Sequence, residues 1–328
     1  MRKNYIIKRL LYAIPVALGV LIFVFLLLHL MPGDPATALL GPDATVEDVE
    51  RVQEQLGLNK NIFVQLFIYM KQLITGDFGT SIIYKTPVVD MIKTAFPATL
   101  ELAIMGMLIA LIISIPLGIL SAVKQNSWID NISMFLAQLG ISMPVFWMGL
   151  LMILLFSVNL NWLPSFGRGM PILKAIVYGF ANWDFSELVL SLKKILMPSF
   201  ALGIMGAAMI SRMIRSTMLE VLDMDYIRTA YAKGTKKMKV ILKHAFRNAL
   251  PPVITIVALQ FGALLGGSIV TESVFSWPGI GQIIVTAILN RDYPVVQASV
   301  FLIAILFVVI NLIVDLLYAV INPKISQE

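Results

Sequence analysis

The feature that most constrains this chain is a set of six apolar stretches, each near the length that a helix needs to cross a bilayer. They lie at about residues 10–30, 99–123, 132–158, 195–217, 250–274 and 296–321. A helix of about 20 residues spans the roughly 30 Å hydrocarbon core and satisfies its backbone hydrogen bonds internally. The stretches therefore predict an all-α membrane protein with six transmembrane helices.

The composition agrees with a membrane bundle and excludes several other classes. Hydrophobic residues make up 59% of the 328 residues and charged residues 13%, and the mean hydropathy is +0.87. The absence of cysteine excludes disulfides and thiolate metal sites. The only histidines, His29 and His244, are far apart in sequence, so we expect no metal site. The net charge of +6 is concentrated in one region and does not indicate a nucleic-acid partner.

The first apolar stretch has two readings. A basic N-terminus, an apolar run and a small-residue motif at 36–38 resemble a signal peptide with its cleavage site. The run is 21 residues long, however, which is longer than a typical signal-peptide core and long enough to span. We therefore expect residues 1–30 to form an uncleaved first transmembrane helix.

The distribution of Lys and Arg predicts the orientation. With the N-terminus in the cytoplasm, 15 basic residues fall in the inner segments and 10 in the longer outer segments, so both termini are expected to be cytoplasmic. Residues 31–95 are then an extracytoplasmic helical cap. Its helix signals are Thr45 before acidic residues and the amphipathic stretch 61–74. Residues 96–322 hold the remaining five spans.

One inner segment is unusually basic. Residues 226–252 read YIRTAYAKGTKKMKVILKHAFRNALPP and contain seven Lys and Arg but no acidic residue. We expect one helix over 219–233, a left-handed stop at Gly234, a second helix over 235–249 and a break at Pro251-Pro252. In the second helix one face is predicted to be cationic (Lys236, Lys239, Lys243, Arg247). Another is predicted to be apolar (Met238, Ile241, Leu242, Ala245, Ala249).

Two interpretations of this loop remain open. In the first, the loop only sets the membrane topology and lies on anionic headgroups. In the second, residues 219–249 form an ordered helical connection that transmits motion from a soluble partner. The chain has no G-x-x-x-x-G-K-[ST] sequence, so if ATP drives it, the nucleotide site is on another chain. It also lacks H-E-x-x-H and G-x-S-x-G, which disfavours an enzyme.

Several sequence motifs resemble one transporter family. RTAYAKG resembles the E-A-A-x-x-x-G loop of ABC importer permeases, with Arg228, Thr229, Ala230 and Gly234 on its defined positions. Arg and Thr replace the first two letters. The other motifs are similar to those of the B-type subunits of dipeptide and oligopeptide permeases and occur in that family's order: LMPGDPA, GDFGTSI, FPATLELA, ESVFSWPGIGQ and NRDYPVVQA.

The resemblance implies a type I ABC importer half in the cytoplasmic membrane of a bacterium or archaeon, with residues 96–322 as its transmembrane domain. It implies four partners: a second permease, two ATP-binding subunits that bind ATP and Mg²⁺, and an extracytoplasmic substrate-binding protein. It also implies that the loop docks on an ATP-binding subunit. This chain itself is expected to bind no cofactor and to catalyse no reaction.

The substrate and its pathway are less constrained. The resemblance implies dipeptides or oligopeptides, with glutathione, nickel chelates or sugars as alternatives. Gln138 and Gln260 lie deep in predicted spans and either bond between helices or line a pathway. Glu272 and Trp277 belong to an outer turn that is either an ordinary turn, with water or headgroups in reach, or an outer gate. A secondary transporter or channel and a membrane scaffold are the rival classes.

Overall fold

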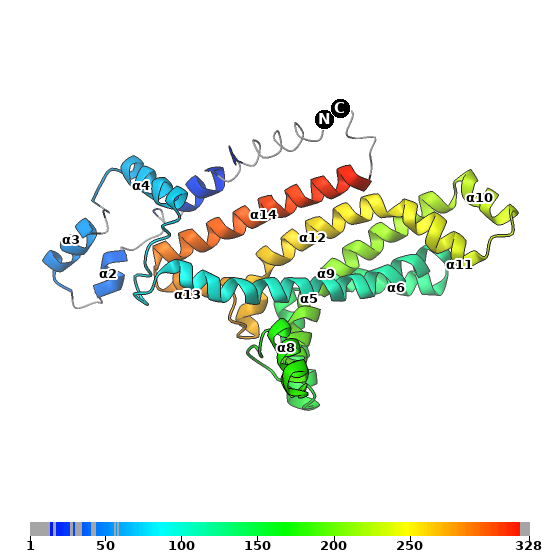
Figure 1. Ribbon diagram of the computed structural model, residues 1–328, viewed down its shortest axis with the longest axis horizontal. Helices are drawn as coiled ribbons and strands as arrows, with labels where there is room; N and C mark the ends of the chain where they lie inside the picture. The colour runs from blue at the N-terminus through cyan, green and yellow to red at the C-terminus, as the bar shows by residue number, and fades with distance from the viewer. Residues whose placement is uncertain are drawn as a thin grey trace.

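The computed structural model describes residues 14–15, 18–26, 29, 35–40, 44–55, 57 and 59–321, and this part of the chain is built from helices. The one β-bridge among the described residues joins Thr80 and Pro87. Four long helices run side by side along the long axis of the molecule (Figure 1): α5 (Val88–Val123), α9 (Ser186–Leu222), α12 (Arg247–Val274) and α14 (Tyr293–Ile321). The predicted all-helical fold is confirmed for these residues.

Four of the six predicted spans fall inside these long helices, which are apolar and long enough to cross a membrane. At 1.5 Å per residue, the 36 residues of α5 measure about 54 Å, so this helix extends well beyond a hydrocarbon core of about 30 Å. The window at 10–30 lies partly outside the described residues. Its residues 18–26 are helical.

The window at 132–158 does not form the single helix that we predicted. α6 (Trp128–Ser142) is followed by α7 (Val145–Met152) and the π-helix η1 (Ile153–Asn159), and the two halves meet at an angle of 103°. Met143 adopts an extended conformation at the bend, which is the conformation that a following proline favours, here Pro144. The proline therefore redirects the chain instead of being tolerated within a straight span.

The predicted break at Pro251-Pro252 is also wrong. The chain stays helical from α11 (Lys237–Lys239) through the π-helix η2 (Val240–Phe246) into α12, which contains both prolines. A proline removes one backbone hydrogen bond from a helix, but packing against neighbouring helices can hold the helix together. α12 packs against α9, α14 and α5.

The most extensive helix pair is α5 with α9, and small residues bring the two backbones close together. A Cβ atom added at Gly203 of α9 would lie 2.4 Å from the carbonyl oxygen of Gly106 in α5. Such small-residue crossings are typical of helix packing in membranes. The largest buried apolar cluster extends along this pair, from Leu102 to Val221, and continues into η2 at Val240.

The shorter helices lie at the two ends and on one side of the bundle (Figure 1). At one end, which we name the cap end, are α2 (Pro35–Leu40), α3 (Val46–Gln55), α4 (Ile62–Thr75) and α13 (Ile280–Leu289). At the other, the basic end, α10 (Asp225–Ala232) and α11 connect α9 to α12. α8 (Ile172–Asn182) projects to one side.

The helix signals of the predicted cap are confirmed. α4 begins at Ile62, where the Asn61 side chain accepts a hydrogen bond from the Phe63 amide. The Thr45 hydroxyl accepts from the Asp48 amide (3.3 Å) and donates to the Asp48 carboxylate (2.6 Å), which holds the pKa of Asp48 below its ordinary value.

Candidate coupling site

The connection between α9 and α12 is an ordered helix–turn–helix. α9 continues to Leu222, so residues 219–222 do not belong to the short helix predicted there, and α10 starts separately at Asp225. Gly234 follows α10 with φ +74°, and its amide donates to the carbonyl of Tyr231 (2.9 Å). The left-handed stop predicted at Gly234 is therefore confirmed. Open space surrounds it, because a Cβ atom there would meet nothing within 4 Å.

The inner side of this loop is packed against the bundle. Ile227 of α10 and Val240, Ile241 and Ala245 of η2 are buried and belong to the cluster that runs along α5 and α9. Ala230 is half-buried and packs against the same cluster. A displacement of α10 or η2 therefore cannot occur without repacking the ends of the long helices.

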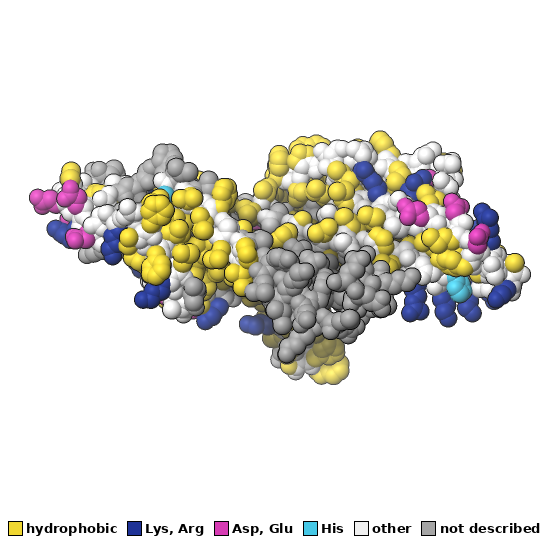
Figure 2. Space-filling view, turned by 90° about the horizontal axis from the view of Figure 1, so that it is seen from above, with side chains coloured by type: hydrophobic (Ala, Val, Ile, Leu, Met, Phe, Trp, Pro, Cys, Tyr) yellow, Lys and Arg dark blue, Asp and Glu magenta, His cyan; other side chains and the backbone are white. Residues whose placement is uncertain are grey.

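The outer side of the loop is cationic. Lys236, Lys239, Lys243 and Arg247 are all exposed, and Lys and Arg side chains gather at the basic end in Figure 2. Arg228 is exposed on α10, where its guanidinium lies 3.8 Å from the Asp225 carboxylate. The Thr229 hydroxyl donates to the Asp225 carbonyl (3.0 Å). The side chains that the sequence assigned to a cationic face thus share the solvent side of the loop.

Apolar side chains are exposed among these cations. Met238 and Leu242, from the predicted apolar face, are 64% and 47% exposed. The reason is that Ile241, Ala245 and Ala249 fill the contact with the bundle, while the short α11 and the π-helix turn Met238 and Leu242 outward. Tyr226 and Tyr231 of α10 are exposed as well. We name the exposed surface of this loop the loop-tip surface. It consists of Tyr226, Tyr231, Met238 and Leu242 together with Lys236, Lys239, Lys243 and Arg247.

An ion pair that the sequence did not predict lies behind the loop. The Arg215 guanidinium on α9 donates to both carboxylate oxygens of Asp130 at the start of α6, each at 2.7 Å. The Ser121 hydroxyl at the end of α5 and the Asn126 amide (3.0 Å) donate to the same carboxylate. Three helices are thereby joined at the basic end. The available signal was Arg215 near the end of a predicted span, because ionisable residues within membrane segments often pair with one another.

The two glutamines predicted within spans contact other helices. Gln138 of α6 is exposed, and its side-chain oxygen accepts a hydrogen bond from Arg212 of α9 (2.9 Å). Gln260 of α12 is half-buried and faces Gly206 of α9, where an added Cβ atom would lie 3.9 Å from the glutamine oxygen. Gln138 therefore bonds between helices, which is one of its two open alternatives.

Glu272 and Trp277 form a buried clamp near the cap end. Glu272 is 0% exposed, so it is not reached by water or headgroups as its position near the end of a span had indicated. Its carboxylate accepts from the Thr99 hydroxyl (2.7 Å) and the Gln282 amide (3.1 Å). The Trp277 indole is 1% exposed and donates to the Ala98 carbonyl (2.9 Å). The clamp ties the turn between α12 and α13 to α5.

A second ion pair attaches the segment before α8 to α5. Arg168 bonds through two nitrogens to one carboxylate oxygen of Glu101, and the Ile172 amide donates to the other oxygen (2.5 Å). The guanidinium also lies over the Trp277 ring, 5.7 Å from its centroid. The Arg168–Glu101 pair therefore also contacts Trp277, and it connects the segment before α8 to the clamp.

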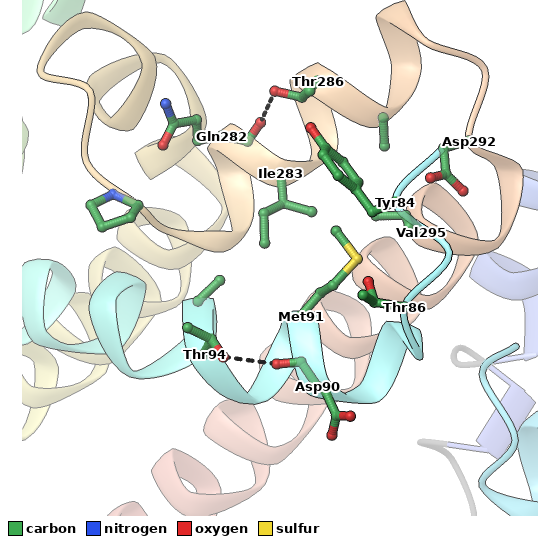
Figure 3. A pocket seen from close by; sticks show the side chains of 13 residues that line it. Tyr84, Thr86, Asp90, Met91, Thr94, Gln282, Ile283, Thr286, Asp292 and Val295 are labelled. Atoms are coloured by element: carbon green, nitrogen blue, oxygen red, sulfur yellow. Dashed lines mark hydrogen bonds between the residues drawn. The ribbon is translucent and has the colours of Figure 1, made fainter. Parts of the chain in front are cut away.

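A groove of about 670 Å³ opens at the cap end between α5, residues 84–86 and α13. In Figure 3, Tyr84, Met91 and Ile283 point toward one another across it. Gln282, from the same motif as Glu272 and Trp277, also lines this groove, whereas those two side chains are buried. The described residues contain no group of three or more His, Asp or Glu side chains placed to hold a metal ion.

Comparisons with known proteins identify the family. The model of the binding-protein-dependent transport system inner membrane component family matches residues 114–327, and the model of that family's N-terminal region matches residues 2–103. The chain belongs to this family. The membership that its motifs predicted is confirmed, as is its relation to dipeptide-type ABC permeases.

Relatives match along almost the whole chain. The chain is 48% identical over 329 residues to the dipeptide transport system permease protein DppB of Alkalihalophilus pseudofirmus, covering 98% of this chain and 99% of that protein. It is 44% identical over 325 residues to the glutathione transport system permease protein GsiC of Escherichia coli strain K12, covering 99% of each.

Solved structures support the fold. A chain of the MetNI methionine ABC transporter in inward-facing conformations superposes with a TM-score of 0.57 at 18% identity. The match covers 71% of this chain and 96% of that one. A second crystal form of the same transporter matches with a TM-score of 0.56. At this identity the likeness concerns the arrangement of helices alone.

Proposed function

We propose that this chain is a transmembrane subunit of an ATP-driven, binding-protein-dependent importer that carries short peptides across a bacterial cytoplasmic membrane. The observation that carries the proposal is the 48% identity to a dipeptide permease along nearly the entire chain. Glutathione is the second candidate substrate, because the identity to a glutathione permease is 44% over 99% of both chains. Glutathione is a tripeptide, so both candidates belong to one chemical class.

The proposal includes six spans with both termini in the cytoplasm. Two observations support this orientation. The basic end carries the exposed lysines and arginines that favour the cytoplasmic side. α14 begins at the cap end and runs toward the basic end, so its C-terminal end points to the proposed cytoplasmic side (Figure 1). The cap end, with the groove lined by Tyr84, Met91 and Gln282, is then the outer mouth of the pathway, where a substrate-binding protein would deliver its cargo.

The loop-tip surface is the proposed docking site for an ATP-binding subunit, which would bind ATP and Mg²⁺. Its exposed Met238 and Leu242 would enter an apolar cleft of that partner, and Lys236, Lys239, Lys243 and Arg247 would meet acidic groups at the rim. Because Ile227 and Val240 pack beneath this surface into the core, movement of the partner would be transmitted to α9 and α12. A second permease subunit would complete the pathway.

The backbone at Gly234 provides the sharpest test of this coupling. Gly234→Val places a β-branched residue at φ +74°, which costs about 1–2 kcal/mol, while the side chain itself meets no neighbour. A strain of this size lowers the population of the docked conformation roughly 5- to 30-fold. Gly234→Asn is the matched control, because asparagine tolerates the left-handed conformation.

The measurement is ATP-dependent uptake of a labelled dipeptide by proteoliposomes that contain the complete transporter, with labelled glutathione as a parallel substrate. The valine variant is expected to insert and assemble normally but to lose most of its uptake, and the asparagine variant to retain it. Equal uptake by the valine variant and the unmodified protein would refute the coupling role. Uptake of neither substrate by the unmodified complex would refute the proposed substrate class.

A further inference from the structure

α8 carries a large apolar surface that no described part of the chain covers. Leu173, Val177 and Phe180 follow one another at i, i+4 and i+7 and are 75%, 63% and 64% exposed. Tyr178 on a neighbouring face is exposed too, and Trp183, which ends the helix, is 84% exposed. The buried side of α8, with Ala175 and Gly179, packs against the start of α9. The helix is therefore held in place by one face, while an exposed apolar stripe lies beside the exposed polar residues Lys174 and Asn182.

The level of α8 along the bundle follows from its attachment to α5. Its first amide, at Ile172, donates to the carboxylate of Glu101 (2.5 Å). Glu101 lies two residues inside the predicted 99–123 span, which is about 3 Å along a helix axis. α8 therefore begins at the boundary between hydrocarbon and headgroups on the cap side of the membrane.

The direction of this region differs from that of the spans. The segment α7–η1 turns by 103° from α6, and α8 projects to one side of the long helices in Figure 1. α7–η1 also exposes apolar side chains, including Leu150, Leu154 and Val158. We name α7–η1, α8 and the connection between them the lateral arm.

The exposed apolar surface of the arm continues that of a span. Phe135 and Leu139 are exposed on α6, which together with α7–η1 is long and apolar enough to be a bent span, and the exposed leucines of α7–η1 follow directly after the bend. α8 combines an exposed apolar stripe with an exposed polar side that holds Lys174 and Asn182, which is the pattern of a helix that lies in a membrane interface. Trp162 and Trp183, both exposed, are of the type that gathers at membrane–water interfaces.

We propose that the lateral arm lies in the outer interface of the bilayer. Phospholipid covers Leu173, Val177 and Phe180, and the indoles of Trp162 and Trp183 sit at the level of the headgroups. The arm thus acts as a lateral anchor that fixes the depth of α9 relative to the membrane. The inference rests on the membrane placement of the proposed function, but not on the substrate or on ATP coupling.

The absence of cysteine from the chain allows a direct test. Single variants Leu173→Cys, Val177→Cys and Phe180→Cys carry a nitroxide label in full-length chain reconstituted into phospholipid nanodiscs, with and without the other transporter subunits. Power saturation then measures the access of oxygen, which concentrates in hydrocarbon, and of a water-soluble nickel chelate. Ile112→Cys, at an exposed position of α5, is the lipid reference, and Val46→Cys, at an exposed position of α3, is the water reference.

The expected result is a higher oxygen than nickel accessibility at all three arm positions, as at Ile112, whether or not the other subunits are present. Nickel access as high as at Val46 would place the arm in water and overturn the inference. Loss of access to both reagents when the second permease is added would overturn it in favour of a subunit interface. Nickel access at Ile112 itself would refute the membrane placement of α5 and, with it, the arm's location; dipeptide uptake tests the transport function separately.

Discussion

The ion pair between Asp130 and Arg215 yields a quantitative prediction for stability. Asp130→Asn keeps the size of the side chain and one acceptor oxygen but removes the charge that Arg215 contacts through two bonds of 2.7 Å. Removing one partner of a buried pair costs about 3–5 kcal/mol, since the other charge stays buried without compensation. The Arg215 side chain keeps 25% of its exposure, so we expect the lower end, about 3 kcal/mol.

The assay is equilibrium unfolding of the purified chain in mixed micelles, followed by circular dichroism. A double-mutant cycle with Arg215→Gln isolates the interaction, because the double variant removes both charges together. The double variant is expected to be less destabilised than the sum of the single variants, by about 1–3 kcal/mol. Arg228→Gln is the control, since its ion pair with Asp225 is exposed to solvent and should contribute little.

Two results would contradict this reasoning. If the effects of Asp130→Asn and Arg215→Gln add, the two side chains do not stabilise one another. If Asp130→Asn changes the free energy of unfolding no more than Arg228→Gln does, the buried Asp130–Arg215 pair does not stabilise the protein more than an exposed pair. In either case the basic end would be held by apolar packing alone.

Two further predictions concern the clamp and the helix crossing. Gly203→Ala should lower the free energy of unfolding by about 1–3 kcal/mol, because the new methyl group would approach the Gly106 carbonyl at 2.4 Å. Gly266→Ala, which meets nothing within 4 Å, should leave the unfolding transition unchanged, and equal effects of the two would disprove the close crossing. Trp277→Phe should cost about 1 kcal/mol by removing the indole N–H that donates to the Ala98 carbonyl. Unfolding in the same micelles measures it, and no change would mean that this hydrogen bond is not formed.

Local sequence was sufficient for much of the helical architecture. Apolar stretches near span length predicted α5, α9, α12 and α14, because a backbone in lipid must satisfy its hydrogen bonds within the helix itself. Gly234 was recognised as a left-handed stop because glycine adopts positive φ at little cost. The motif order was also sufficient to predict the family.

Where the local sequence was compatible with two conformations, only the tertiary structure showed which one the chain adopts. Pro144 and Pro251 are both prolines within apolar runs, yet the chain bends by 103° at the first and stays helical at the second. Asp130 meets Arg215, 85 residues away, and Glu272 is buried against Thr99. Patterns within a few residues cannot specify such partners, since they depend on which helix faces meet. The sequence alone therefore determined the four long helices and the family, while packing between helices determined the ion pairs and the composition of the loop-tip surface.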